Sequence, residues 1–71
     1  MEEDELFADA IAIVIMEHHA TASLLQRRLC VAYKRAEKLL DMLQSKGIIG
    51  PAQGSKPREI LVGWEYLDRL L

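Results

Sequence analysis

The 71-residue sequence has little with which to cross-link itself, because it holds one cysteine, Cys30, and only two histidines. A single cysteine cannot form an internal disulfide, and no set of Cys and His residues has the spacing of a zinc site. Stability must therefore come from packing, which suits a reducing compartment. We expect a cytoplasmic chain without a metal or a cofactor.

The sequence also lacks a long apolar run and a basic amino terminus. Its longest apolar run, residues 10–16, is far shorter than the about 18 residues that a membrane helix needs. Residues 1–5 read Met-Glu-Glu-Asp-Glu, whereas a secretory signal begins with basic residues. No membrane contact is expected of this chain.

Nothing in the sequence indicates catalysis. It contains no Walker phosphate loop, nucleophile elbow or pair of carboxylates in a catalytic arrangement. Cys30 has no neighbouring His that would activate it. His18 and His19 fall at the end of a predicted helix, where the helix dipole favours them, and no partners at ligand spacing accompany them. We therefore expect no catalytic residue and a binding domain rather than an enzyme.

What the sequence does have is separated charge. The net charge is −2, but residues 1–18 carry six acids and no base, whereas residues 19–58 carry eight bases against two acids. At physiological ionic strength charges are screened beyond about 8 Å, so a phosphate responds to the nearest face and not to the molecular total. The basic middle of the chain therefore indicates an anionic partner, nucleic acid first of all.

Three helices are predicted in the first two thirds of the chain. Apolar residues recur at three- and four-residue intervals over residues 4–18, which predicts a first helix. A short second helix over 24–29 follows two candidate N-caps, Thr21 and Ser23. A longer third helix over 33–46 carries basic residues in its first half. A short helix, a turn and a longer basic helix is the order of a helix-turn-helix.

After the third helix the sequence changes to two short β-prone runs, residues 48–51 and 59–62. Turn-forming Gly and Pro residues lie between them, together with Lys56 and Arg58. These features predict a β-hairpin with an exposed basic tip. Beyond it, apolar residues at helical spacing predict a last short amphipathic helix over 64–71.

Together these elements predict a mainly α fold with a small β-hairpin: a winged helix-turn-helix with a three-helix core, a wing and a short C-terminal helix. The length leaves room for one domain, over residues 1–71. In this fold the third helix is expected to enter the major groove of DNA, while the wing contacts the backbone or the adjacent groove. Phosphate contacts would supply affinity, and base contacts from Lys34, Arg35 and Lys38 would supply sequence preference.

Several residues have a structural interpretation beside the functional one. A solvated helix face explains Lys34, Arg35 and Lys38 equally simply, but their clustering beside a basic hairpin favours DNA. A short helix cannot aim both Arg27 and Arg28 at one surface, so the stem of one is expected to pack over the core. Three further residues are expected to be structural: Tyr33 as a core or turn anchor, Cys30 as a semi-buried turn residue and Trp64 as a lid on the core.

Four segments carry a resemblance to a known family: Ser-Leu-Leu-Gln-Arg-Arg-Leu (23–29), Tyr33 with Arg35-Ala36, Leu-Leu-Asp (39–41) and, most specific of all, Gly-Pro-Ala-Gln-Gly-Ser-Lys-Pro-Arg-Glu (50–59). They resemble the gamma domain at the end of the FtsK/SpoIIIE family of bacterial DNA translocases. The resemblance runs over about residues 5–62 and leaves 63–71 as a C-terminal extension.

The resemblance implies a winged helix that reads short sequences on double-stranded chromosomal DNA and so orients a hexameric translocase during chromosome segregation and cell division. It further implies a motor domain in the same parent protein, which would be anchored in the membrane at the division septum, and a XerD-type recombinase as a partner. The DNA-binding residues that it implies are Arg27 and Arg28 in the second helix, Arg35 in the third, and Ser55, Lys56 and Arg58 in the wing.

The chain departs from the family around the turn before the third helix. The family usually has Arg-Ile-Gly-Tyr-Asn-Arg-Ala where this chain has Cys-Val-Ala-Tyr-Lys-Arg-Ala, residues 30–36. An Asn side chain can make two hydrogen bonds to an adenine edge, whereas Lys34 prefers guanine acceptors or phosphate. The consensus DNA target of the family therefore does not carry over with the fold.

Two alternatives stay open from the sequence. A free-standing winged-helix transcription regulator would need a dimer interface, for which the first helix and residues 64–71 are candidates. A protein-interaction module, for example one that docks a recombinase, would use the same fold with an incidental basic face. The oligomeric state tests the first alternative, and a DNA titration tests the second.

Overall fold

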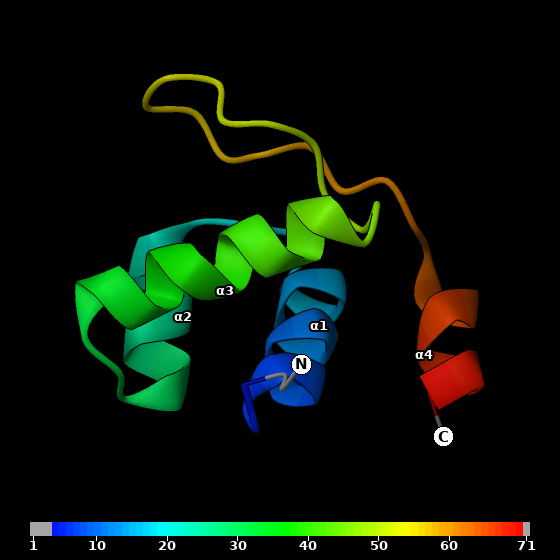
Figure 1. Cartoon of the computed structure of the whole chain (residues 1–71). Coiled ribbons are helices and arrows are strands. Elements are labelled where there is room, and N and C mark those ends of the chain that lie inside the picture. Colours follow the sequence, from blue (N-terminus) through cyan, green and yellow to red (C-terminus); the bar gives the residue numbers. More distant parts are fainter. Residues whose placement is uncertain (1–3, 71) are drawn as a thin grey trace.

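A computed structural model describes residues 4–70 of the chain. Its helices are α1 (Phe7–Glu17), α2 (Ala22–Leu29), α3 (Tyr33–Ser45) and α4 (Trp64–Leu70). Figure 1 shows a long loop that leaves α3, arches over it and returns to α4, which packs beside α1. The mainly helical fold predicted from the sequence is confirmed. None of the helices within 4–70 is long and apolar enough to cross a membrane.

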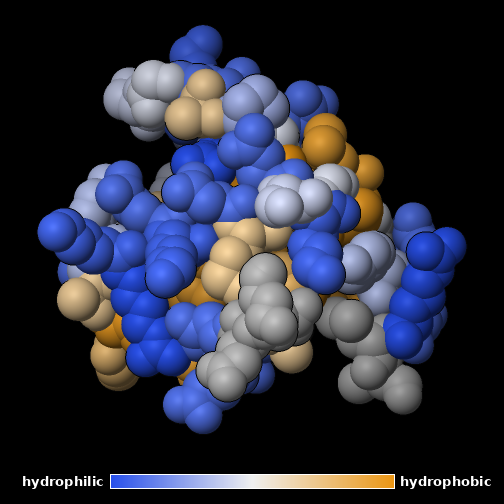
Figure 2. Space-filling model, viewed as in Figure 1, coloured by the Kyte–Doolittle hydropathy of each residue, from blue (hydrophilic) through white to orange (hydrophobic). Residues whose placement is uncertain are grey.

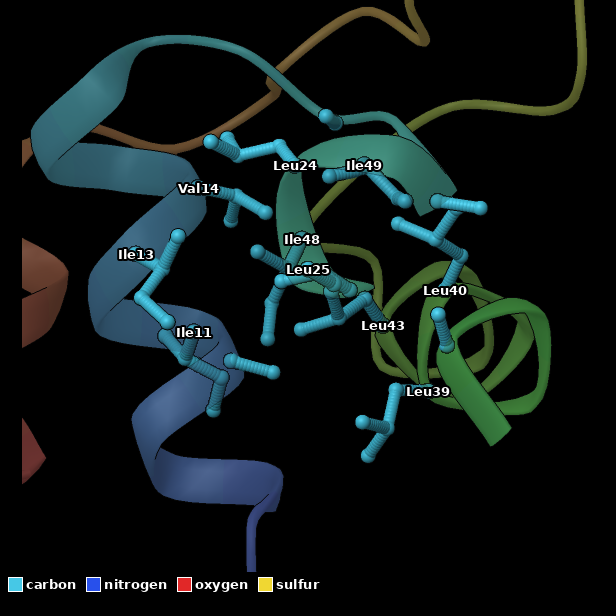
Figure 3. Packing of buried hydrophobic residues seen from close by; sticks show 14 of the residues in the cluster. Ile11, Ile13, Val14, Leu24, Leu25, Leu39, Leu40, Leu43, Ile48 and Ile49 are labelled. Atoms are coloured by element: carbon cyan, nitrogen blue, oxygen red, sulfur yellow. The ribbon is translucent and has the colours of Figure 1, made fainter. Parts of the chain in front are cut away.

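The core is formed by the apolar faces of α1, α2 and α3 together with the residues that follow α3. Figure 3 shows side chains from these three helices and the post-α3 segment meeting in one cluster. Burying one such aliphatic side chain stabilises the fold by about 1.5–3 kcal/mol. The buried leucines of α3 therefore fix its position against α1 and α2. The largest fully buried side chains are Val14, Leu25, Leu39, Leu43, Ile48 and Ile49.

The N-cap of α2 is Thr21 and not the other predicted cap, Ser23. The backbone N–H of Leu24 donates to Thr21 Oγ1 at 3.2 Å, and Thr21 has the extended backbone of an N-cap. This bond satisfies one of the amides that a helix start leaves unpaired. The helix therefore starts two residues earlier than predicted.

Two non-glycine residues in the left-handed conformation separate the first three helices. His18, with φ 54°, ends α1, and Cys30, with φ 56°, ends α2. A left-handed residue at this position stops a helix and turns the chain. Cys30 is a turn residue as predicted, but it is exposed and not semi-buried.

The two predicted strands, 48–51 and 59–62, are not formed as regular strands. The loop has isolated antiparallel bridges at Ile49–Ile60 and Gln53–Lys56 instead. Its prolines lie between these bridges and donate no backbone hydrogen bond, so they interrupt a ladder that would otherwise join the bridges. The chain still runs out and back, because Gly50 N–H donates to the Glu59 carbonyl at 2.8 Å.

α4 reaches the core through Tyr66 and Leu67, which are partly buried against it. Trp64 is 61% exposed, so the prediction that it covers the core is wrong. The sequence pattern placed Trp64 and Leu67 on the buried face together. In the structure the edge formed by Tyr66 and Leu67 faces inward and the first residue of the helix does not.

Candidate nucleic-acid interface

α3 buries one face and exposes lysines on the opposite one. Ala36, Leu39 and Leu40 are buried, whereas Lys34 and Lys38 are exposed. Neither lysine makes a hydrogen bond or an ion pair within residues 4–70. Two ammonium groups one helical turn apart are therefore available on the outer face of the helix. Figure 2 shows hydrophilic residues covering much of this side of the molecule, while apolar ones gather where the chain descends from the loop to α4.

Arg35 reaches the start of α1, where the charge of Lys38 also acts on the carboxylate of Asp4. Its Nε donates to Asp4 Oδ2 at 2.8 Å and its Nη2 donates to Oδ1 at 2.6 Å. The hydrogen bonds from Arg35, followed by one from the backbone N–H of Leu6, lower the pKa of Asp4 to about 2. The pair is thus fully ionised at neutral pH.

The two arginines of α2 are separated as well. Arg28 pairs with Glu17 at the end of α1 and ties the two helices together. The side chain of Arg27 is exposed and makes no hydrogen bond or ion pair within residues 4–70. Both residues are exposed, and the acid on α1 engages the guanidinium of Arg28. That the stem of one of them packs over the core stays a prediction.

The loop presents only part of its predicted basic tip. Ser55 and Lys56 are exposed. The side chain of Arg58 is only 14% exposed and lies against α3, where its guanidinium donates to Gln44 Oε1 at 3.3 Å and to Asp41 Oδ1 at 3.4 Å. The prediction that Arg58 lies on an exposed hairpin is therefore wrong.

A groove of about 520 Å³ lies between the loop, α3 and residues 19–23 at the start of α2. Tyr33 and Glu37 line it from the helix, and Ser55 and Lys56 line it from the loop. Tyr33 is 51% exposed, so of its two expected roles, core or turn anchor, the first is wrong. The cations that line the groove, Lys56 and Arg58, both come from the loop, whereas the helix contributes the acid Glu37; Lys34 and Lys38 do not line it. An extended polyanion would therefore have to contact the exposed lysines of α3 outside this groove.

Sequence reasoning missed the acids that engage the predicted arginines. The sequence pattern gives Asp4 and Glu17 only as part of an acidic first helix, and Asp41 only as part of the Leu-Leu-Asp segment that resembles the family. The separation of charge along the chain could have indicated these pairs. In a three-helix core the acidic first helix lies beside the basic second and third helices, so its acids can pair with their arginines. Among residues 4–70 there is also no group of three or more His, Cys, Asp or Glu side chains that could hold a metal ion.

The Ftsk gamma domain family matches residues 1–63 of the chain. The chain belongs to the FtsK gamma domain family. The resemblance seen in the sequence is thereby confirmed, and α4 lies beyond the matched region.

Bacterial relatives place this gamma domain within much larger proteins. DNA translocase FtsK of Halalkalibacterium halodurans is 50% identical over 60 residues, which cover 84% of this chain and 8% of that protein. DNA translocase SpoIIIE of Bacillus subtilis is 42% identical over 67 residues, covering 94% of this chain and 8% of the relative. DNA translocase SftA of Bacillus subtilis is 49% identical over 61 residues, covering 86% and 6%. The chain thus spans less than a tenth of the length of these relatives.

Proposed function

We propose that this gamma domain is a non-catalytic winged-helix module that binds double-stranded DNA in a sequence-directed way and thereby orients a translocase motor of its parent protein. In this proposal α3 is the recognition helix and the loop between α3 and α4 is the wing. The domain works on the cytoplasmic side of a parent protein anchored at the division septum, during chromosome segregation.

The observation that carries the proposal is the exposure of lysines on two elements, α3 and the loop that follows it. Lys34 and Lys38 are exposed on the helix, Ser55 and Lys56 are exposed on the loop, and no described acid neutralises any of the lysines by an ion pair. Cations held on two elements can follow a duplex backbone, while the outer face of α3 enters the major groove. The translocase names of the relatives support DNA as the polyanion.

A protein-interaction role, for example docking a XerD-type recombinase, is the second candidate. It is favoured by the exposed apolar side chains Trp64, Leu61 and Met16, which the DNA-binding proposal leaves unused. A domain that docks protein alone would show no salt-dependent affinity for a duplex, so one titration separates the two candidates.

The test is a fluorescence-anisotropy titration of a labelled duplex with the 71-residue chain at several salt concentrations. With about three to four lysine and arginine contacts to phosphate, log affinity should fall against log salt with a slope of about −3. Lys38→Ala and Lys56→Ala should each weaken binding and make that slope shallower by about one.

Arg69→Ala provides the matched control. It removes the same charge from an exposed position on α4, which packs against α1 and not against α3. Its affinity should equal that of the unmodified chain to within about twofold, since a solvated surface charge at a distance is screened. No binding at low salt, or an equal loss in all three variants, would overturn the proposal.

A further inference from the structure

Asp4 connects the start of α1 to the first turn of α3. Its carboxylate accepts from Arg35 at 2.6 and 2.8 Å and from the backbone N–H of Leu6 at 2.9 Å. Its carbonyl accepts from the N–H of Phe7 at 2.9 Å. With Arg35 in place the Asp4 side chain is 14% exposed, and the Leu6 amide holds its carboxylate independently of Arg35.

Apart from the burial of Ala36 in the core, the first turn of α3 has few side-chain interactions that orient it. The residue that caps it, Ala32, has no side chain that could accept a hydrogen bond. Within residues 4–70, the pair with Asp4 is the only hydrogen bond or ion pair made by a side chain from Tyr33 to Ala36. A guanidinium that grips a carboxylate at two points fixes direction as well as distance. The ion pair therefore sets how this turn lies against α1.

We propose that Arg35 is a positioning residue which makes no contact with DNA: by gripping Asp4 it fixes the first turn of α3 so that Lys34 and Lys38 face the duplex. The inference rests on the proposed DNA-binding function. It reassigns a residue that both the sequence pattern and the family resemblance place at the DNA.

A direct DNA contact by Arg35 makes the opposite prediction for Asp4. If Arg35 bound phosphate or a base, Asp4 would compete with the DNA for the same guanidinium. Removing the Asp4 charge would then release Arg35 and tighten binding. If Arg35 positions the helix, removing that charge frees the turn, reduces the population of the binding-competent orientation and weakens binding. The sign of the change distinguishes the two roles.

The experiment compares Asp4→Asn with Glu5→Gln in the same duplex titration. Both variants lose one negative charge at neighbouring positions, but exposed Glu5 makes no hydrogen bond to Arg35 and acts on it only through its charge. We expect Asp4→Asn to weaken binding by about two- to fivefold, the range of one partly exposed ion pair. Glu5→Gln should leave binding unchanged or tighten it slightly, because DNA repels the lost carboxylate.

Arg35→Lys keeps the positive charge and loses the two-point grip. A phosphate contact tolerates this change, since lysine also binds phosphate well as a point charge. A positioning role does not, so we expect a loss of about two- to fivefold. In the Asp4→Asn background the same change should have no further effect, because the two residues act as one unit. This comparison still tests the positioning role if Asp4→Asn lowers the stability of the fold. Each titration is then run below the melting temperature of the variant being titrated.

The outcomes distinguish failure of the proposed DNA-binding function from failure of the positioning role of Arg35. If the unmodified chain shows no salt-dependent binding, the proposed function fails. If it binds but Asp4→Asn binds as tightly as Glu5→Gln, the positioning role is overturned; if Asp4→Asn binds more tightly, the role is overturned and Arg35 is a direct contact. Weaker binding in Asp4→Asn and in Arg35→Lys, without additivity, supports the role proposed here.

Discussion

The guanidinium of Arg58 lies 3.4 Å from the carboxylate of Asp41 and joins the base of the loop to the middle of α3. The same guanidinium donates to Gln44, and the backbone N–H of Arg58 donates to the carbonyl of Ala20 at 3.1 Å. Three separate parts of the chain thus meet at this residue. Because the loop holds only two isolated bridges, contacts to α3 and to the segment before α2 must fix its position.

Arg58→Ala should therefore lower stability, by about 1–2 kcal/mol, through the loss of packed stem and hydrogen bonds. Lys56→Ala removes the same charge from an exposed position nearby and should change stability by less than about 0.5 kcal/mol. Urea denaturation followed by circular dichroism measures both. Equal stabilities of the two variants would contradict the contacts of Arg58 with α3.

The ion pair of Asp4 and Arg35 predicts a specific dependence of stability on acid. The pKa of Asp4 falls from an ordinary 3.8 to about 2 in the folded chain. A lowered folded-state pKa contributes stability that is present above the unfolded value and is lost as the pH falls through the folded one. Chemical denaturation from pH 2 to 7 should show the unmodified chain more stable than Asp4→Asn above about pH 4, with the difference shrinking toward pH 2. A difference that stays constant down to pH 2 would contradict the lowered pKa.

The orientation of α4 is tested by two neighbouring substitutions. Trp64 is 61% exposed, whereas Leu67 is partly buried against the core. Leu67→Ala should cost about 1–2 kcal/mol, less than a fully buried leucine. Trp64→Ala should cost less than about 0.5 kcal/mol, although it removes the larger side chain. The reverse order in thermal or urea unfolding would restore Trp64 as a cover for the core.

The helices could be predicted from the sequence because each must bury an apolar face that recurs with helical spacing. The ends of the helices were less predictable, because they depend on which residue caps the unpaired backbone amides. The first helix starts at Phe7 and not at Asp4, because the Asp4 carboxylate accepts the backbone N–H of Leu6 just before it. A local reason also explains why the predicted strands are not formed. The β-prone runs favour pairing, but Pro51 and Pro57 lie between the two bridges and interrupt the hydrogen bonds of a ladder.

The candidate site could be predicted only in its residue types. The basic middle of the chain contains Lys34, Lys38 and Lys56, which the structure leaves exposed. The pairings of the arginines were hidden, because Arg35 and Asp4 lie 31 positions apart and Arg58 and Asp41 lie 17 apart. No local pattern encodes a contact of that range; it depends on how the helices pack.

Lys34 is the position at which this chain is expected to differ from its family in DNA sequence preference. It replaces an Asn of the usual family pattern, and it lies exposed in the first turn of α3. Side chains in the first turn of a recognition helix are those that reach base edges. We therefore predict that Lys34→Asn shifts the selected DNA sequence, with a change of about 1–3 kcal/mol in the preference between the old and new sites.

Selection of bound sequences from a random duplex pool, carried out with the unmodified chain and with Lys34→Asn, measures this shift. Lys38→Asn is the matched control: it makes the same chemical change one turn further along the same exposed face. Both substitutions remove a phosphate attraction, so both should lower affinity for all sequences, but only the base-reading position should change the motif. Fold stability should change by less than about 1 kcal/mol in either variant, since exposed Lys and Asn differ mainly in helix propensity. If Lys34→Asn selects the same motif as the unmodified chain, Lys34 contacts phosphate alone. A motif changed only by Lys38→Asn would then move base recognition one turn along α3, toward the position where Arg58 anchors the loop.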